Sequence, residues 1–235
     1  MRTGFGIARV LFAVLGIAAI ATQFASSATA IASKGGSVGA FVVNFFSFFT
    51  IDSNVLAVVV LLVGAFFAFA RSGDDPNWYT VLRAVATTYM ATTGIVYNLL
   101  LRNIALPQGQ TVPWSNEVLH VVIPIYLVLD WFFAPGRAAL RNKALWWIVG
   151  FPIVWAVYTL IRGPFAGDPV TGLMPWYPYP FLNPATSRNG YLSVSFYVIL
   201  IAVVILAVGF GVVWISRRWP GARGARAPQL ELSTE

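Results

Sequence analysis

Long apolar stretches alternate with short polar or glycine- and proline-rich segments along most of the chain. Six stretches are long enough to cross a hydrocarbon core of roughly 30 Å as helices, which takes about 17–25 residues each. We therefore predict an all-α polytopic membrane protein, with one six-helix transmembrane domain over residues 1–216 and a basic, then polar, tail at 217–235 that is disordered. The predicted spans are 7–25, 50–70, 79–101, 117–133, 145–161 and 191–215.

The apolar segment 37–70 is too long for one spanning helix, because its thirty-odd residues would extend about 50 Å. A polar cluster divides it, Thr50-Ile51-Asp52-Ser53-Asn54. Threonine, aspartate, serine and asparagine are common at helix N-termini, where their side chains accept backbone hydrogen bonds. We therefore expect the second spanning helix to begin at Thr50, with residues 45–49 in the interface or in a short helix that does not span.

Composition narrows the class of protein and of chemistry. The chain is 58% hydrophobic and 10% charged, which is typical of a membrane protein and not of a soluble domain. Its basic residues lie between the apolar spans, so they do not indicate a nucleic-acid-binding face. No cysteine is present, and a single histidine cannot supply bis-histidine haem or a histidine-rich zinc site. We expect neither a metal nor an organic cofactor.

The basic residues predict the topology. If the N-terminus lies inside, eleven of the fifteen fall on the inner side and four on the outer side, which satisfies the positive-inside rule with both termini cytoplasmic. We expect the plasma membrane as the location. The motif Ala28-Thr29-Ala30 after the first span also fits a signal-peptide cleavage site, but the length of the apolar run favours an uncleaved helix.

The only histidine, His120, lies one turn inside the fourth span. An ionisable side chain at membrane depth usually has a function. Because the second and fourth spans both run inward, Thr50 and His120 should lie at similar depth near the outer end of the bundle. A threonine hydroxyl becomes a nucleophile when a base within about 3 Å takes its proton. The two residues are therefore candidates for nucleophile and general base, although Thr50 as a helix cap and His120 as a helix-packing group remain alternatives.

Asp130 cannot orient His120, because ten helical residues separate the two by about 15 Å. Its level matches that of Arg83 at the start of the third span, which favours a structural ion pair. Asp52 is level with His120 and is a candidate to support it, or it interacts with the helix dipole or faces water. Candidate donors for an acyl oxyanion are the backbone amides near Thr50 and the side chains of Asn54, Asn98, Tyr97 and Tyr191.

Three short motifs, in this order and spacing, resemble the androgen-induced-protein family and its bacterial six-helix relatives over roughly residues 5–215. They are Phe48-Phe49-Thr50-Ile51-Asp52-Ser53-Asn54, then Leu119-His120 with Pro124 and Asp130-Trp131, and Tyr177-Pro178-Tyr179-Pro180-Phe181. The resemblance implies a multipass threonine hydrolase that cleaves fatty acid esters of hydroxy fatty acids. By motif, its threonine and histidine fall on Thr50 and His120. A lipid or fatty-acyl ester would then be the substrate.

Two other functions fit the same sequence. The protein could bind or transport a lipid or small molecule without covalent chemistry, using His120 and the threonines of the third span as a lining. It could instead be an assembly partner whose aromatic segment 176–181 docks another membrane protein. Labelling by an electrophilic probe would separate the first from a hydrolase. The second predicts that changes in segment 176–181 abolish co-purification of the partner, whereas changes at Thr50 do not.

Overall fold

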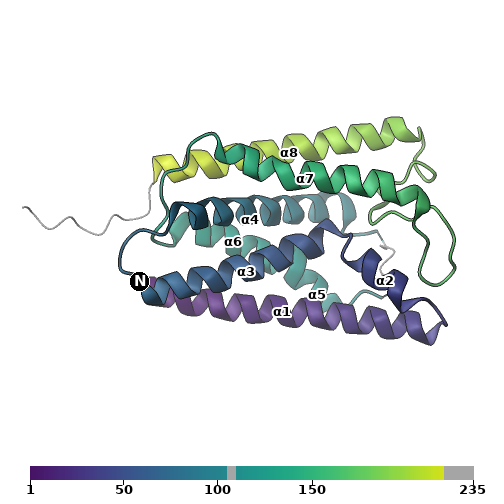
Figure 1. Cartoon of the computed structure of the whole chain (residues 1–235), viewed down its shortest axis with the longest axis horizontal. Coiled ribbons are helices and arrows are strands. Elements are labelled where there is room, and N and C mark those ends of the chain that lie inside the picture. Colours follow the sequence, from purple (N-terminus) through teal and green to yellow (C-terminus); the bar gives the residue numbers. More distant parts are fainter. Residues whose placement is uncertain (105–109, 220–235) are drawn as a thin grey trace, which may run out of the picture.

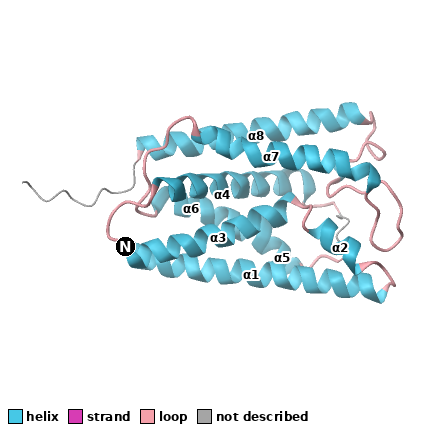
Figure 2. Ribbon diagram, in the orientation of Figure 1, coloured by secondary structure: helices cyan, strands magenta, loops and turns pink. Residues whose placement is uncertain are grey.

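The computed structural model describes residues 1–104 and 110–219, and this part of the chain contains helices and no strands (Figure 2). Six helical segments are long and apolar enough to cross a membrane, so the predicted all-α, multi-pass architecture is confirmed. They lie side by side along the long axis (Figure 1). Their bounds are α1 (Arg2–Ser33), α3 (Phe49–Ala70), α4 (Asn77–Val96) with a π-helical turn (Tyr97–Leu101), α5 to α6 (Pro113–Phe133), α7 (Ala144–Arg162) and α8 (Tyr191–Arg218).

The helices extend beyond several of the predicted spans. α1 has 32 residues where the apolar pattern predicted 7–25, and the motif Ala28-Thr29-Ala30 lies within it. The fourth segment begins at Pro113, four residues before the predicted start, because proline fits the first helical turn, where its missing N–H is not needed. α8 continues to Arg218, into the predicted tail, and residues 220–235 of that tail lie outside the described residues.

The apolar segment 37–70 is divided close to the predicted point. A short helix, α2 (Val38–Phe45), is followed by three residues and then by α3. The N-cap position of α3 is Phe48, which offers no side-chain acceptor, so Thr50 lies inside the first turn and does not cap the helix. The free N–H groups at this helix start must therefore be satisfied by another part of the protein.

The bundle has α1 and α3 along one side, α7 and α8 along the other, and α4 and α6 between them (Figure 1). Small residues let the helices approach closely, as is usual where lipid supplies no hydrophobic driving force. A Cβ atom at Gly16 of α1 would lie 3.0 Å from Val58 of α3. At Gly64 of α3 it would lie 1.9 Å from the hydroxyl oxygen of Tyr79, which donates to the Val60 carbonyl.

A buried ion cluster joins α1, α4 and α6. Asp130 accepts hydrogen bonds from Nε of Arg9 at 2.9 Å and from Nε of Arg83 at 2.8 Å, and all three side chains are at most 2% exposed. Arg9 also donates to the Gly64 carbonyl of α3. The structure thus contains the ion pair expected between Asp130 and Arg83. Arg9 as a second partner was not predicted, because a basic residue near the start of the first span is equally typical of a topology signal.

Replacing Asp130 with Asn should lower the free energy of unfolding by about 3–5 kcal/mol, because it leaves two buried guanidinium groups without a counter-charge. Reversible unfolding of the detergent-solubilised protein measures this effect. The matched control is Glu117→Gln, which removes the partner of Arg102 in an exposed pair and should cost less than about 1 kcal/mol. Equal losses in the two variants would contradict the assignment of the cluster as the main polar link between these helices.

Candidate active site

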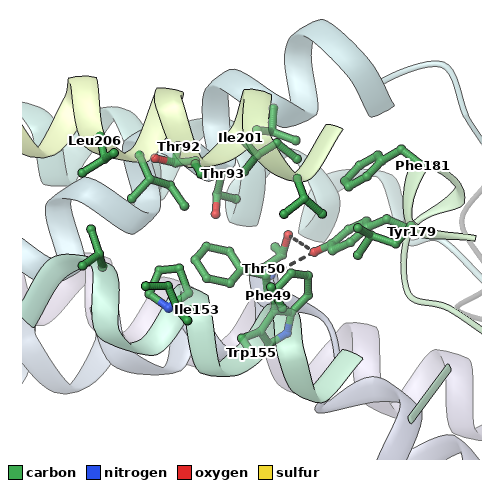
Figure 3. A pocket seen from close by; sticks show the side chains of 18 of the residues that line it. Phe49, Thr50, Thr92, Thr93, Ile153, Trp155, Tyr179, Phe181, Ile201 and Leu206 are labelled. Carbon is green, nitrogen blue, oxygen red and sulfur yellow. Dashed lines mark hydrogen bonds between the residues drawn. The ribbon is translucent and has the colours of Figure 1, made fainter. Parts of the chain in front are cut away.

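Thr50 is hydrogen-bonded to Tyr179, a residue from the segment between α7 and α8 (Figure 3). The backbone N–H of Thr50 donates to the Tyr179 hydroxyl oxygen at 3.2 Å, and the two hydroxyl oxygens are also 3.2 Å apart. Tyr179 therefore supplies the acceptor that Phe48 cannot supply at the start of α3. Burial raises the pKa of Tyr179 to about 12, against the opposing effect of the hydrogen bonds from Thr50, so the phenol is protonated at neutral pH.

The aromatic segment before α8 is packed into the protein. Trp176 lies edge-on against Phe48 at 5.8 Å and beneath the guanidinium of Arg162, which in turn donates to the Asn44 side chain at 2.5 Å. Tyr179 lies edge-on against Phe48 and stacks on Phe181. The rings of Trp176 and Tyr179 are at most 5% exposed, so they do not form a surface that could dock a partner protein.

His120 lies in a π-helical turn (Val118–Val122) between α5 (Pro113–Glu117) and α6 (Ile123–Phe133). Its Nδ1 is 2.9 Å from the carbonyl oxygen of Asn116. A carbonyl only accepts, which assigns the proton of the neutral ring to Nδ1 and leaves Nε2 as an acceptor. The ring also stacks on Tyr97 of the facing π-helical turn, with centroids 4.2 Å apart. The imidazole is therefore oriented by a backbone carbonyl and an aromatic ring.

The π-helical turn at His120 is supported by two neighbouring residues. Pro124 has no N–H to pair with the carbonyl of His120, and it packs against α4 at Gly94, where a Cβ atom would lie 3.2 Å from the proline ring. Asn54 donates to the Leu119 carbonyl at 3.1 Å and to the Thr50 carbonyl at 2.9 Å. Asn54 thus joins the first turn of α3 to the turn that carries His120, and both of its N–H groups are used.

Thr50 and His120 border the same small pocket, of about 20 Å³. No hydrogen bond joins the two side chains directly within the described residues, and the pocket has room for about one water molecule. The other side chains around it come from α1, the start of α3 and the α5 segment, namely Gln23, Phe48, Ile51, Asn116 and Leu119. The structure thus brings both residues to one pocket that has room for a water molecule.

Thr50 also borders a second, larger cavity of about 450 Å³ between α4, α7 and α8 (Figure 3). Its volume lies within the range of roughly 300–1,000 Å³ typical of small-molecule sites. The described residues that line it include no charged side chain. Trp146 and Ile153 on its rim are 78% and 58% exposed, so the cavity reaches the apolar outer face of the bundle. An acyl chain can therefore enter it from the side.

Three of the residues that the sequence put forward as supporting groups lie elsewhere. Asp52 borders a separate groove between α3, α4 and α7. Asn98 is exposed and donates to the Gly94 carbonyl one turn earlier, and Tyr191 is exposed at the start of α8. The contact of Tyr179 with Thr50 was not predicted. The only sequence signal at Tyr179 is the aromatic and proline-rich motif, which does not indicate that this tyrosine reaches Thr50.

The described residues contain no group of three His, Cys, Asp or Glu side chains that could hold a metal ion. No protein-family model, curated protein or solved structure matches this chain.

Replacing Tyr179 with Phe should lower the free energy of unfolding by about 0.5–2 kcal/mol, the usual cost of a lost helix cap, because the Thr50 N–H loses its acceptor. Thermal unfolding in detergent measures the loss. Tyr197→Phe is the control, since that ring also packs against Phe181 and its hydroxyl makes no hydrogen bond to a described residue. A loss no larger in Tyr179→Phe than in Tyr197→Phe would show that the hydrogen bond to Thr50 does not stabilise the start of α3.

Proposed function

We propose that this protein is an intramembrane lipid-ester hydrolase with Thr50 as nucleophile and His120 as general base, located in the plasma membrane with both termini cytoplasmic. One observation carries the proposal. The Thr50 side chain borders both an apolar cavity suited to an acyl chain and a water-sized pocket that His120 also borders. The motif resemblance to the androgen-induced-protein family, whose threonine and histidine fall on the same two residues, supports it independently.

The first half of the reaction forms an acyl-enzyme. The acyl chain occupies the apolar cavity with its ester carbonyl beside Thr50. Oγ1 attacks the carbonyl carbon. Its proton passes to Nε2 of His120 through a water molecule in the small pocket, because no hydrogen bond joins the two side chains directly. The bond from carbon to the leaving oxygen then breaks, and the alcohol takes the proton from His120. The products of this half are an ester of Thr50 and a free alcohol.

The second half returns the enzyme to its starting state. A water in the small pocket attacks the acyl carbon and gives one proton to His120. The bond from carbon to Oγ1 breaks, Oγ1 recovers that proton, and the fatty acid leaves through the apolar cavity. The sum is ester plus water to acid plus alcohol, with no metal or organic cofactor in any step.

One donor next to Oγ1 is placed to stabilise the oxyanion. It is the hydroxyl of Tyr179, which lies 3.2 Å from Oγ1 and accepts from the backbone N–H of Thr50, so that its own proton is available to donate. Loss of one donor of this kind typically lowers kcat by about 10²–10³-fold. Tyr179 takes this role in place of Asn54 and Asn98, because Asn54 has both N–H groups bound to carbonyls and Asn98 lies at the surface.

Thr50→Ala should abolish turnover of long-chain p-nitrophenyl esters and labelling by a fluorophosphonate probe, because the nucleophilic oxygen is gone. His120→Gln should lower kcat by about 10²–10⁴-fold, the usual contribution of a general base. Purified protein in detergent or nanodiscs serves for both measurements. The control is Thr88→Val, which removes a buried threonine hydroxyl that donates to the Ala84 carbonyl.

Unchanged turnover in Thr50→Ala and His120→Gln would end the hydrolase proposal. Binding of lipid without probe labelling in the wild-type protein would favour the other function, a non-catalytic lipid-binding or transport protein. The apolar cavity supports that alternative equally well, so covalent labelling of Thr50 is the observation that separates the two.

A further inference from the structure

The groove that Asp52 borders runs between α3, α4 and α7 and encloses about 1060 Å³. It shares no lining residue with the cavity that Thr50 borders. Its wall is mostly apolar, and two of its side chains, Val59 of α3 and Trp147 of α7, are 47% and 70% exposed. Exposed apolar side chains at membrane depth contact lipid, so this groove is open to the bilayer.

The groove extends about half-way across a membrane. On α4 its lining residues run from Asn77 to Tyr89, which is about 18 Å along the helix axis. On α7 they run from Lys143 to Phe151, which is about 12 Å. Half of a hydrocarbon core of roughly 30 Å is about 15 Å. The groove therefore has the length of an acyl chain in one leaflet.

Two cationic side chains border the groove at the end where α4 and α7 begin, Arg141 and Lys143. Both are exposed, and neither side chain has an ion pair or hydrogen bond with another described residue. The segment that carries them is held in place by Arg217 of α8, which donates to the Leu140 carbonyl at 2.7 Å and to the Asn142 side chain at 2.6 Å. Arg141 and Lys143 are therefore available to bind an anion at a fixed position.

The acidic residue among the described lining residues lies at the other end of the groove. Asp52 belongs to the first turn of α3, where the ring of Phe49 lies 6.0 Å from that of Phe151. Phe151 is eight residues beyond Lys143, which corresponds to about 12 Å along α7. The positive charge is thus concentrated at one end, and an apolar wall separates it from Asp52.

We propose that this groove binds an anionic phospholipid, with its phosphate between Arg141 and Lys143 and one acyl chain along α4. Basic pockets between membrane helices recognise lipid head groups in this way. Trp78 borders the groove at the same end, and tryptophan is common at the level of the head groups. This end is the cytoplasmic one in the predicted topology, which assigns the lipid to the inner leaflet. The site is independent of Thr50 and needs no turnover.

Native mass spectrometry of the delipidated protein in detergent measures the Kd values of phosphatidylglycerol and phosphatidylcholine with the same acyl chains. We expect the wild type to prefer phosphatidylglycerol about 25-fold, since each of the two cations contributes about five-fold. Arg141→Gln/Lys143→Gln should bind the two lipids almost equally. Arg188→Gln/Arg218→Gln removes the same charge from exposed positions outside the groove and should keep the preference.

A second pair of variants tests the acyl chain. Val59→Trp fills the groove and should weaken binding of both phospholipids about ten-fold, the effect of losing about two methylene contacts with the wall. Val154→Trp is the control, because Val154 is exposed on α7 and lies outside the groove. Glycerophosphoglycerol, the head group without chains, should not displace phosphatidylglycerol. Thermal unfolding checks that each variant is folded.

Equal affinity of the wild type for the two phospholipids would overturn the inference, and would be the result if a second copy of the chain or another membrane helix covered the groove. An equal loss of preference in the two glutamine variants would also overturn it, because the effect would then come from net charge. Displacement by glycerophosphoglycerol, or unchanged binding in Val59→Trp, would show that an anion binds without a seated chain and would equally contradict the proposal.

Discussion

The structure depends on one constraint: a charged side chain or a helix-start N–H group that is buried at membrane depth needs a partner inside the protein, because hydrocarbon offers none. The ion cluster of Arg9, Asp130 and Arg83 satisfies this constraint at one end of the bundle and thereby fixes three helices relative to one another. At the other end, the first turn of α3 has free N–H groups and no capping side chain. Tyr179 is brought from 129 residues away to satisfy one of them.

The same need for partners assembles the candidate site. Asn54 ties the turn of Thr50 to the turn of His120 by donating to a carbonyl in each, which holds the two near one pocket. The π-helical turn and Pro124 leave carbonyls without their usual helical partners, and Asn54 satisfies one of these. The contacts that stabilise the helix ends are therefore also the contacts that position the hydroxyl and the imidazole.

The sequence predicted the structural features that depend on position along a helix. Apolar length predicted six spanning helices, and the alternating direction of the helices predicted the common level of Thr50 with His120 and of Asp130 with Arg83. The direction in which each side chain faces around the helix axis could not be predicted, because α3 is apolar on nearly every face. The sequence therefore did not show that Asp52 lies on the opposite side of α3 from Thr50. The contact of Tyr179 depends on the path of an irregular segment, for which hydropathy carries no information.

The hydrogen-bond partner of His120 Nδ1 determines the charge of the candidate site. It is an uncharged carbonyl, whereas many catalytic histidines lie against a carboxylate, so the resting site between Thr50 and His120 carries no net charge. In the proposed reaction, an imidazolium and an oxyanion would arise together in a medium of low permittivity, where opposite charges attract strongly and a lone ion is costly. Neither charge would persist without the other, so the enzyme would hold its positive charge only for the lifetime of the tetrahedral adduct.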